Sequence, residues 1–392
     1  MKILVNAASC VIGGGVQVAT SFIINAMNCS EHQWLFAVSS PVMDNLTAAG
    51  CSKDKRIVKV SPAPSLPIKG RHSRATLRRL ENDFNTDVVF TVFGPAYVGF
   101  KATHICGFAV PSTTHPNREM YNVLTFRQKI KMLLLMAKDK IFLRKKDFYM
   151  LETTVARKGL ARYIGFPIEN AVVIHNTYAP VFTNARVVRR STPDIIKLLT
   201  LSGYYRHKNL EIIPSVALEL KRMGTKKTFV FTLTLPHNQA ETHNILAEAE
   251  RLGVSDMIVN RGPVSMTDCP NLYNEHDFVF MPTLLETFSA TYPEAMKMER
   301  PIITTNLDFA RDICRDSASY YSPMSPLDAA RKIMELAQSQ AMVDKLIAAG
   351  RKRLNDFPTP EEKFKMQLSW ILQVVDKTHS TGNIYKANTT AF

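Results

Sequence analysis

The sequence predicts an α/β protein made of two doubly wound halves. Short apolar runs alternate with longer amphipathic segments along most of the chain, as strands and helices do in such folds. The alternation is interrupted between Asn176 and Pro193 by a stretch with two prolines and no helical or strand periodicity. The length of 392 residues also suits about two or three domains.

The first half, residues 1–180, contains seven apolar runs that predict strands. They are residues 3–6, 34–38, 57–60, 88–92, 104–108, 148–151 and 171–174. Amphipathic segments between them predict helices at residues 16–27, 71–84, 117–137 and 153–163. This half is expected to form one Rossmann-like domain.

The irregular stretch predicts a linker at residues 181–195, and the alternation then restarts to give a second domain at residues 196–356. Predicted strands are 196–202, 228–233, 257–259, 278–281 and 301–304, and predicted helices are 209–223, 239–252, 271–275, 289–298 and 327–349. A terminal helix at 357–378 could pack on either domain, and we expect the N-terminal one. Residues 379–392 are predicted to be a flexible tail.

Composition excludes several classes of protein. The six cysteines show no CxxC spacing and no Cys/His cluster, which argues against a structural zinc site and suits reduced thiols. The first residues, MKILVNAA, form too short an apolar run for a signal peptide and predict a strand. No run approaches the roughly 18 to 20 apolar residues that span a bilayer. We therefore expect a cytoplasmic protein, soluble or peripheral to the inner face of the membrane.

Positive charge is concentrated in the first half. Residues 1–185 hold 23 Lys and Arg against 11 Asp and Glu, which accounts for most of the net charge of +15. Basic and apolar residues alternate from Arg127 to Lys146, a composition that suits an anionic membrane surface. A solvated helix face over an ordinary core stripe explains the pattern equally well. Nucleic acid is not expected, because no recognised nucleic-acid motif is present.

Two turns carry features of anion sites. Gly13, Gly14 and Gly15 separate the first strand from its helix, so backbone N–H groups there are open to an anion or a sugar. The spacing is not GxGxxG, and a plain tight turn between strand and helix is an equal alternative. In the second half, Arg206 to Lys208 precede a helix expected to begin near Asn209. Cations at that end suit a bound phosphate, although a basic surface loop is the simpler explanation.

Two carboxylates follow the apolar run 278–281. Glu294 lies between Tyr292 and Met296 inside the predicted helix, where it would suit two vicinal ribose hydroxyls. Glu286 lies in the loop before that helix and could bind sugar hydroxyls beside free backbone N–H groups. A glycosidase pair is the alternative, disfavoured because two α/β halves indicate a nucleotide cleft.

The segment ETFSATYPEAM, residues 286–296, and the strand that begins PII at Pro301 resemble the retaining glycosyltransferases of the GT-B fold, glycosyl transferases group 1. That family's signature is Glu, seven residues, Glu, with Phe two positions after the first acid. VVIHN at 172–176 and GPV at 262–264 also match its pattern. The resemblance is strong over about residues 145–310 and weak over 1–145. It implies two Rossmann-like domains that face each other across a cleft.

The resemblance implies a hexosyltransferase that uses a nucleotide-diphosphate sugar with retention and without metal or cofactor. Glu286 and Lys208 would be catalytic, with Lys208 neutralising the leaving diphosphate. Residues that would bind the donor are Glu294, Thr287, Phe288, Ser289, Arg206, Gly14 and Gly15. The acceptor would be a glycan, lipid-linked in view of the basic first half, as in O-antigen or capsule-like surface polysaccharide assembly.

Three departures from the family pattern leave other functions open. Gly203-Tyr204 stands where the family has Gly-Arg, so Arg206 is a candidate replacement. Thr287 and Ser289 stand where it has glycines. The family's N-domain histidine has no clear counterpart, and His115, in a loop, is a better acceptor-side candidate than His104. The alternatives are a nucleotide-sugar epimerase of the same fold and a non-catalytic basic protein that binds membrane or nucleic acid. The base, sugar, acceptor, linkage and oligomeric state are not encoded in any recognisable motif.

Overall fold

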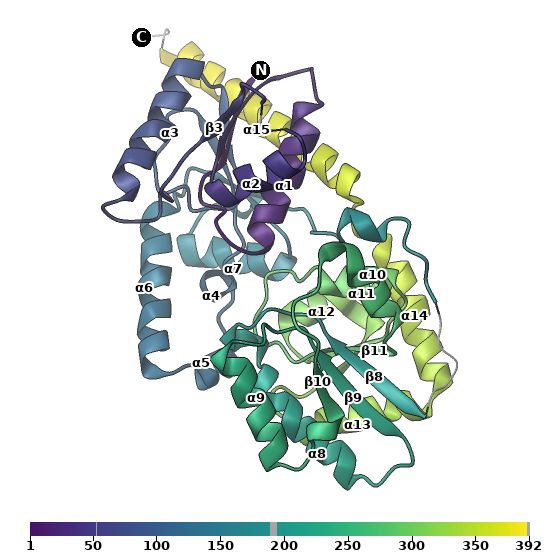
Figure 1. The fold of residues 1–392 in the computed structure, drawn as a ribbon. Helices are drawn as coiled ribbons and strands as arrows, with labels where there is room; N and C mark the ends of the chain where they lie inside the picture. Colours follow the sequence, from purple (N-terminus) through teal and green to yellow (C-terminus); the bar gives the residue numbers. More distant parts are fainter. Residues whose placement is uncertain (52, 189–193, 390–392) are drawn as a thin grey trace. The chain divides into compact units, whose positions relative to one another are not determined.

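The computed structural model describes residues 1–51, 53–188 and 194–389 and divides into two compact α/β units (Figure 1). Unit 1 comprises Met1–His115, Met132–His175 and Pro360–Phe392. Unit 2 comprises Pro116–Lys131 and Asn176–Thr359. The predicted α/β fold with two Rossmann-like domains is confirmed. Residues 116–131 belong to unit 2, although the sequence places them in the first half. Of the predicted linker, residues 189–193 lie outside the described residues.

Unit 1 is built on seven parallel strands in the order β3-β2-β1-β4-β5-β6-β7. Their bounds are β1 Lys2–Ala7, β2 Gln33–Val38, β3 Ile57–Lys59, β4 Val88–Thr91, β5 Thr103–Gly107, β6 Phe148–Leu151 and β7 Ala171–Val173. The strand order reverses between β1 and β4. In a doubly wound sheet such a reversal opens a crevice at the carboxyl ends of the two strands.

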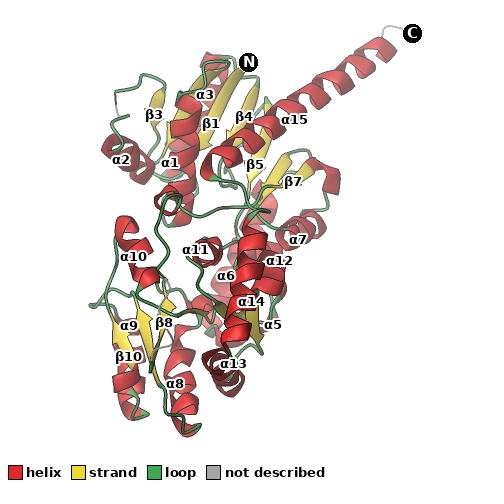
Figure 2. Ribbon diagram, turned by 90° about the vertical axis from the view of Figure 1, so that its right-hand side faces the viewer, coloured by secondary structure: helices red, strands yellow, loops and turns green. Residues whose placement is uncertain are grey.

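Helices cover both faces of this sheet. They are α1 Gly14–Met27, α2 Ser40–Ala48, α3 Gly70–Phe84, α4 Pro111–Thr114, α7 Thr154–Ile164, the 3-10 turn Ile168–Asn170, α15 Pro360–Thr389 and most of α6 Phe126–Phe142. Alternation along β1 sets the faces, because Ile3 and Val5 pack with α1 and α15 whereas Leu4 packs with α3. Figure 2 shows α15 running past β4 and β5. It continues to Thr389, beyond the predicted end at residue 378.

Unit 2 repeats the same plan with six parallel strands in the order β10-β9-β8-β11-β12-β13. Their bounds are β8 Ile195–Thr200, β9 Thr228–Leu233, β10 Ile258–Asn260, β11 Phe278–Met281, β12 Ile302–Thr305 and β13 Ala318–Tyr321. The reversal lies between β8 and β11, which pair with Leu199 beside Val279. The loops after these two strands therefore meet at one edge of the sheet.

The core of unit 2 has two layers. Phe231 and Phe280 face the layer of α8 and α13, and Val279 and Ile302 face that of α10, α11 and α12. The helices are α5 Arg118–Val123, α8 Ile213–Arg222, α9 Ala240–Arg251, α10 Cys269–Asn274, α11 Thr291–Lys297, α12 Asp308–Cys314, α13 Pro326–Gln338 and α14 Gln340–Leu354. Four 3-10 turns that bear on the site or core are Pro180–Phe182, Arg206–Lys208, Leu210–Ile212 and Met266–Asp268.

Three predicted helices differ from the structure for local reasons. The helix predicted at 117–137 is two helices, because Leu124 is extended and ends α5. The helix predicted at 209–223 begins at Ile213, because Asn209 adopts a left-handed conformation with φ of 54°. The helix predicted at 327–349 breaks at Ser339, whose side chain caps α14. Within the described residues, no helix combines the length and apolar character that a membrane span needs.

Candidate functional site

The candidate site lies in unit 2, where the loops after β8 and β11 meet. Lys208 follows β8, and Glu286 follows β11. Lys208 Nζ and Glu286 Oε1 form an ion pair, with 16% and 12% of the two side chains exposed. This pairing places a cation and a carboxylate at the switch point of the sheet, the usual ligand position in doubly wound folds.

Backbone and hydroxyl contacts hold the two loops together. Leu284 N donates to His207 O at 2.7 Å, which ties the β11 loop to the turn that carries Lys208. Thr283 Oγ1 lies 3.2 Å from Glu286 Oε1 and 3.3 Å from His207 O. Thr305 Oγ1 donates to Thr283 O at 2.7 Å and fixes the start of the loop from β12. The carboxylate of Glu286 is therefore held on a cross-braced loop.

The three basic residues before Asn209 have different surroundings. Burial lowers the pKa of His207, and the charge of Lys208 lowers it further against the opposing effect of Glu286. The His207 ring stacks on Tyr205, with 5.5 Å between the ring centroids. Of the three side chains, Lys208 is the one that pairs with the Glu286 carboxylate.

Arg206, the candidate replacement for the missing family arginine, is bound to other groups. Its guanidinium pairs with Glu211, which also accepts a hydrogen bond from the Tyr204 hydroxyl. Its Nε donates to Val123 O at 2.8 Å and so attaches the end of α5 to this turn. Arg206 therefore braces the site in this structure, and a phosphate would have to compete with Glu211 for it.

Thr287, Phe288 and Ser289 are buried in the loop between Glu286 and α11. Phe288 packs edge-on against Phe357, with ring centroids 5.6 Å apart. Thr287 is 4% exposed, and its Oγ1 has no hydrogen-bond partner in the described structure. A buried hydroxyl without a partner costs stability, so this one is a candidate for contact with a bound ligand.

Glu294 is 6% exposed on α11. Burial raises its pKa to about 7, against the lowering effects of hydrogen bonds from the Tyr273 hydroxyl and the backbone of Ala179. The Tyr273 hydroxyl lies 3.1 Å from Glu294 Oε2. A carboxyl that titrates near neutral pH in a protein interior is a marker of functional sites, although structural networks also produce such shifts.

The predicted glycine turn lies in unit 1. Gly13 has a φ of 62°, a left-handed value that favours glycine, and it precedes α1. A Cβ built on Gly14 would meet nothing within 4 Å, and one on Gly15 would meet Phe93 Cδ2 at 3.4 Å. Space beside Gly14 is therefore open on this unit.

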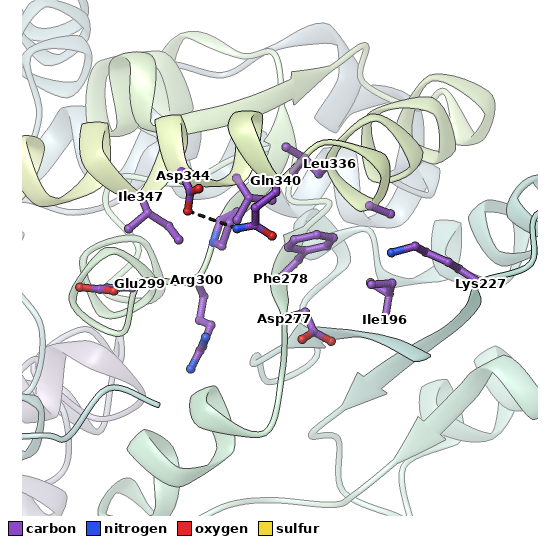
Figure 3. Close-up of a pocket in the computed structure, with 13 residues that line it drawn as sticks. Ile196, Lys227, Asp277, Phe278, Glu299, Arg300, Leu336, Gln340, Asp344 and Ile347 are labelled. Carbon is purple, nitrogen blue, oxygen red and sulfur yellow. Dashed lines mark hydrogen bonds between the residues drawn. The ribbon is translucent and has the colours of Figure 1, made fainter. Parts of the chain in front are cut away.

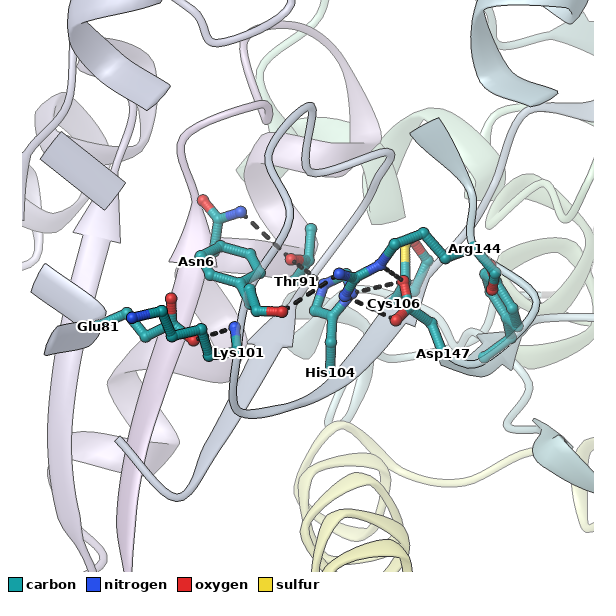
Figure 4. Close-up of polar contacts among 11 residues, drawn as sticks. Asn6, Glu81, Thr91, Lys101, His104, Cys106, Arg144 and Asp147 are labelled. Atoms are coloured by element: carbon teal, nitrogen blue, oxygen red, sulfur yellow. Dashed lines mark hydrogen bonds and ion pairs between the residues drawn. The ribbon is translucent and has the colours of Figure 1, made fainter. Parts of the chain in front are cut away.

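The two histidines of unit 1 have separate environments. His104 is 5% exposed and bridges Thr91 Oγ1 and Asp147 Oδ2, each at 2.9 Å (Figure 4). Arg144 also pairs with Asp147 at 2.7 Å. Burial raises the pKa of Asp147, but its hydrogen bonds and charge contacts with His104 and Arg144 outweigh burial and lower it. This network holds the His104 ring inside the core of unit 1. His115 ends α4, and its Nδ1 lies 2.7 Å from Thr114 Oγ1.

Sequence reasoning missed three residues that contact the site. Thr283 and Tyr273 contact the two carboxylates, and no sequence signal links them to that role. Asn117 caps α5 by accepting from Met120 N at 2.8 Å and also donates to Leu284 O at 2.7 Å. The capping role of Asn117 can be predicted from the sequence, because Asn precedes a first turn that contains an acidic residue. Its contact with the β11 loop cannot be predicted in this way.

Two pockets lie at opposite ends of the unit 2 sheet. A small pocket is lined by Thr200, Lys208 and Thr283, at the carboxyl ends of β8 and β11. A larger pocket lies at the amino ends of the strands, beside Asp277, Arg300 and Gln340 (Figure 3). We place the candidate site at the smaller pocket, because ligands of doubly wound sheets bind at carboxyl ends. Among described residues, no three His, Cys, Asp or Glu side chains form a metal-binding group.

Comparison with known proteins agrees with this fold. Residues 184–353 match the family model of glycosyl transferases group 1. A glycosyltransferase from Rickettsia africae superposes with a TM-score of 0.74 at 16% identity, covering 95% of this chain and 98% of that one. HepE of Anabaena, solved with UDP and glucose, superposes with a TM-score of 0.65 at 13% sequence identity, covering 94% of this chain and 99% of that one.

WaaG, a glycosyltransferase involved in lipopolysaccharide biosynthesis, gives a TM-score of 0.66 at 13% identity, covering 93% of this chain and 99% of that one. At these identities the likeness shows a shared GT-B fold. No curated protein sequence matches the chain.

Proposed function

We propose that this chain, whose residues 184–353 match the family model of glycosyl transferases group 1, is a retaining glycosyltransferase. It transfers a hexose from a nucleotide-diphosphate donor to a glycan acceptor. The observation that carries the proposal is the ion pair of Lys208 with Glu286 at the carboxyl ends of β8 and β11. Both residues fall inside the family match.

The proposed reaction breaks the bond between the anomeric carbon of the sugar and the donor phosphate oxygen. The acceptor hydroxyl forms the new bond on the same face, and its proton passes to the leaving phosphate. Negative charge grows on the diphosphate as the bond breaks, and the Lys208 ammonium offsets it in a partly buried setting. Glu286 accepts hydrogen bonds from sugar hydroxyls and keeps Lys208 in place until the diphosphate binds.

The donor nucleotide is assigned to the neighbouring groups of unit 2. Glu294 accepts from the ribose hydroxyls, and the unpartnered Thr287 hydroxyl binds the sugar together with the backbone of Thr287–Ser289. The solved structure of HepE with UDP and glucose supports a nucleotide and a sugar as ligands of this fold. No metal ion or other cofactor takes part in the proposed reaction.

The acceptor is proposed to be a lipid-linked oligosaccharide at the cytoplasmic face of a membrane, in surface polysaccharide biosynthesis. Two observations support it. WaaG, of similar fold, is involved in lipopolysaccharide biosynthesis. Residues 1–185 hold 23 basic against 11 acidic residues, a balance that favours an anionic surface or a phosphate-bearing acceptor.

The proposal is tested with a panel of nucleotide sugars added singly to the purified protein without metal. Thermal stabilisation reports binding, and release of nucleoside diphosphate reports slow donor hydrolysis. One donor is expected to stabilise the protein, and Glu294→Ala is expected to abolish that stabilisation. The matched control is Glu250→Ala, which removes an exposed glutamate from α9 and should respond like the wild type.

Each alternative gives a distinct result in the same assay. An epimerase would convert one donor into its epimer without releasing nucleoside diphosphate. A protein that has lost the chemistry would give no release, and Glu286→Ala would behave like the wild type. Either result would overturn the proposal.

A further inference from the structure

Helix α6 carries large apolar side chains that face solvent. It spans Phe126–Phe142 and buries Met132 and Asp139. Its exposed apolar side chains include Phe126 at 78%, Ile130 at 43%, Leu133 at 52%, Leu134 at 65% and Ile141 at 75%. A soluble helix normally turns such residues inward, so this exposed surface requires an explanation.

These side chains form one continuous stripe. An α-helix turns by about 100° per residue. On that spacing the five exposed apolar side chains all lie within about 50° of one direction around the helix axis, so they share a single face. The buried residues Met132 and Asp139 lie on roughly the opposite side of the helix. The stripe therefore lies on the face of α6 opposite its buried side chains.

Basic residues flank the stripe on both sides. Arg127 and Lys131 lie along one margin, and Lys129 and Lys140 lie along the other. Arg127, Lys131 and Lys140 are exposed, and Lys129 is half-buried. An apolar stripe between two rows of cations is the pattern of a helix that lies in the plane of an anionic membrane.

Residues 132–142 of α6 belong to unit 1, and a second segment of unit 1 extends this part of the surface. Lys138 Nζ donates to Ser65 O at 2.9 Å and lies 4.4 Å from the centroid of the Tyr97 ring. Lys138 thus holds the loop before α3 beside α6 instead of facing solvent. That loop exposes Leu66 at 42% and Ile68 at 77%. We call these residues and the α6 stripe with its flanking cations the α6 surface.

We propose that the α6 surface docks on an anionic lipid bilayer, with the apolar stripe in the acyl boundary and the flanking cations at the headgroups. Nucleic acid would pair with the cations but would leave the apolar side chains in water. A membrane surface accommodates both the apolar side chains and the cations, and α6 lacks the length and apolar character needed to cross the bilayer. This inference stands without the glycosyltransferase proposal, since it concerns no residue of the donor site.

The test is co-sedimentation of the full-length protein with vesicles of phosphatidylcholine alone or with phosphatidylglycerol. We expect binding to the anionic vesicles that weakens with salt, and little binding to the neutral ones. Leu134→Ser with Ile141→Ser, and separately Lys129→Glu with Lys131→Glu, should each weaken binding about tenfold or more. The matched control, Ile195→Ser with Val259→Ser, removes exposed apolar residues of unit 2 and should bind like the wild type.

A second readout guards against misfolded variants. Phe126→Trp adds an indole to the stripe, and lipids brominated near the headgroup should quench its emission beyond the quenching of the wild-type tryptophans. Donor hydrolysis by all these variants should stay at its wild-type level, which separates docking from chemistry. Equal vesicle binding by the stripe variants would overturn the inference. So would tighter binding to a duplex oligonucleotide, or a dimer that the stripe variants abolish.

Discussion

Lys208 Nζ and Glu286 Oε1 form an ion pair between residues 78 apart in the sequence, and this contact joins the two loops of the switch point in unit 2. Replacing one partner leaves the other partly buried without its counter-charge. Lys208→Met should therefore lower the melting temperature more than Lys208→Met with Glu286→Gln. Turnover of the donor should fall about 10²- to 10³-fold in either variant, by loss of charge stabilisation. Calorimetry and release of nucleoside diphosphate measure the two effects.

A second substitution at Lys208 tests whether the positive charge of this side chain is what supports turnover. Lys208→Arg keeps the charge but changes its shape, so it should retain more turnover than Lys208→Met. Lys221→Met, on an exposed helix end of unit 2, should leave turnover unchanged. Wild-type turnover by Lys208→Met would contradict the proposed catalytic role of Lys208.

Glu294 makes stability depend on pH. Burial raises its pKa from 4.5 to about 7, so between these values the folded protein holds a proton that the unfolded chain has lost. Folding stability should therefore fall as pH rises through this range, by up to about 3 kcal/mol above pH 7. Glu294→Gln should flatten the dependence. Denaturant unfolding at a series of pH values checks this, and equal slopes for both proteins would contradict it.

Substitution of Thr287 should change ligand binding and folding stability in opposite directions. Its buried Oγ1 has no partner, so Thr287→Val, of similar shape, should raise stability by about 1 kcal/mol. If the hydroxyl binds the donor sugar, the same variant should raise the KM for the donor severalfold, whereas Thr287→Ser should keep it near the wild-type value. If Thr287→Val is more stable than the wild type and equally active, the Thr287 hydroxyl does not bind the donor.

Asn117 connects α5 to the loop that carries Glu286. Asn117→Asp keeps an oxygen to cap Met120 N but loses the donor to Leu284 O, whereas Asn117→Ala loses both. Both variants should lower kcat, because the β11 loop loses a brace, and the Ala variant should also lose about 1 kcal/mol of cap energy. Wild-type kcat for Asn117→Asp would show that the Leu284 contact has no functional part.

Gly14 tests the unit 1 turn. A Cβ there meets nothing within 4 Å, so Gly14→Ala should leave the melting temperature unchanged or slightly higher. The family resemblance assigns this backbone to the donor, so the variant should nevertheless weaken donor binding. Isothermal titration measures the affinity for the donor in the variant and in the wild type. Unaltered affinity would favour a plain turn.

Much of the secondary structure could be predicted from local sequence patterns. Apolar runs and their periodicity predicted every strand of the first sheet and five of the second. The Glu286 to Glu294 segment predicted the family whose model residues 184–353 match, because its residues lie close in sequence. The α2 and α12 helices and β13 were missed, since their short segments carry little periodicity. The break at Ser339 was missed because its cap competes with a longer helical pattern.

The contacts that complete the site were beyond sequence reasoning because they join distant segments. Asn117 reaches Leu284 across 167 residues, and Tyr273 reaches Glu294 through tertiary packing. The three adjacent basic residues at 206–208 look equivalent in sequence. Their partners, Glu211 for Arg206, Tyr205 for His207 and Glu286 for Lys208, emerge only from the fold.

Hydrogen–deuterium exchange with and without the stabilising nucleotide sugar tests the central claim most directly, because it locates the ligand on unit 2. We predict slower exchange in residues 201–210 and 282–295, around Lys208, Glu286 and Glu294. Slower exchange confined to residues 225–228, 298–301 and 340–344, at the larger pocket on the amino ends of the strands, would contradict the account.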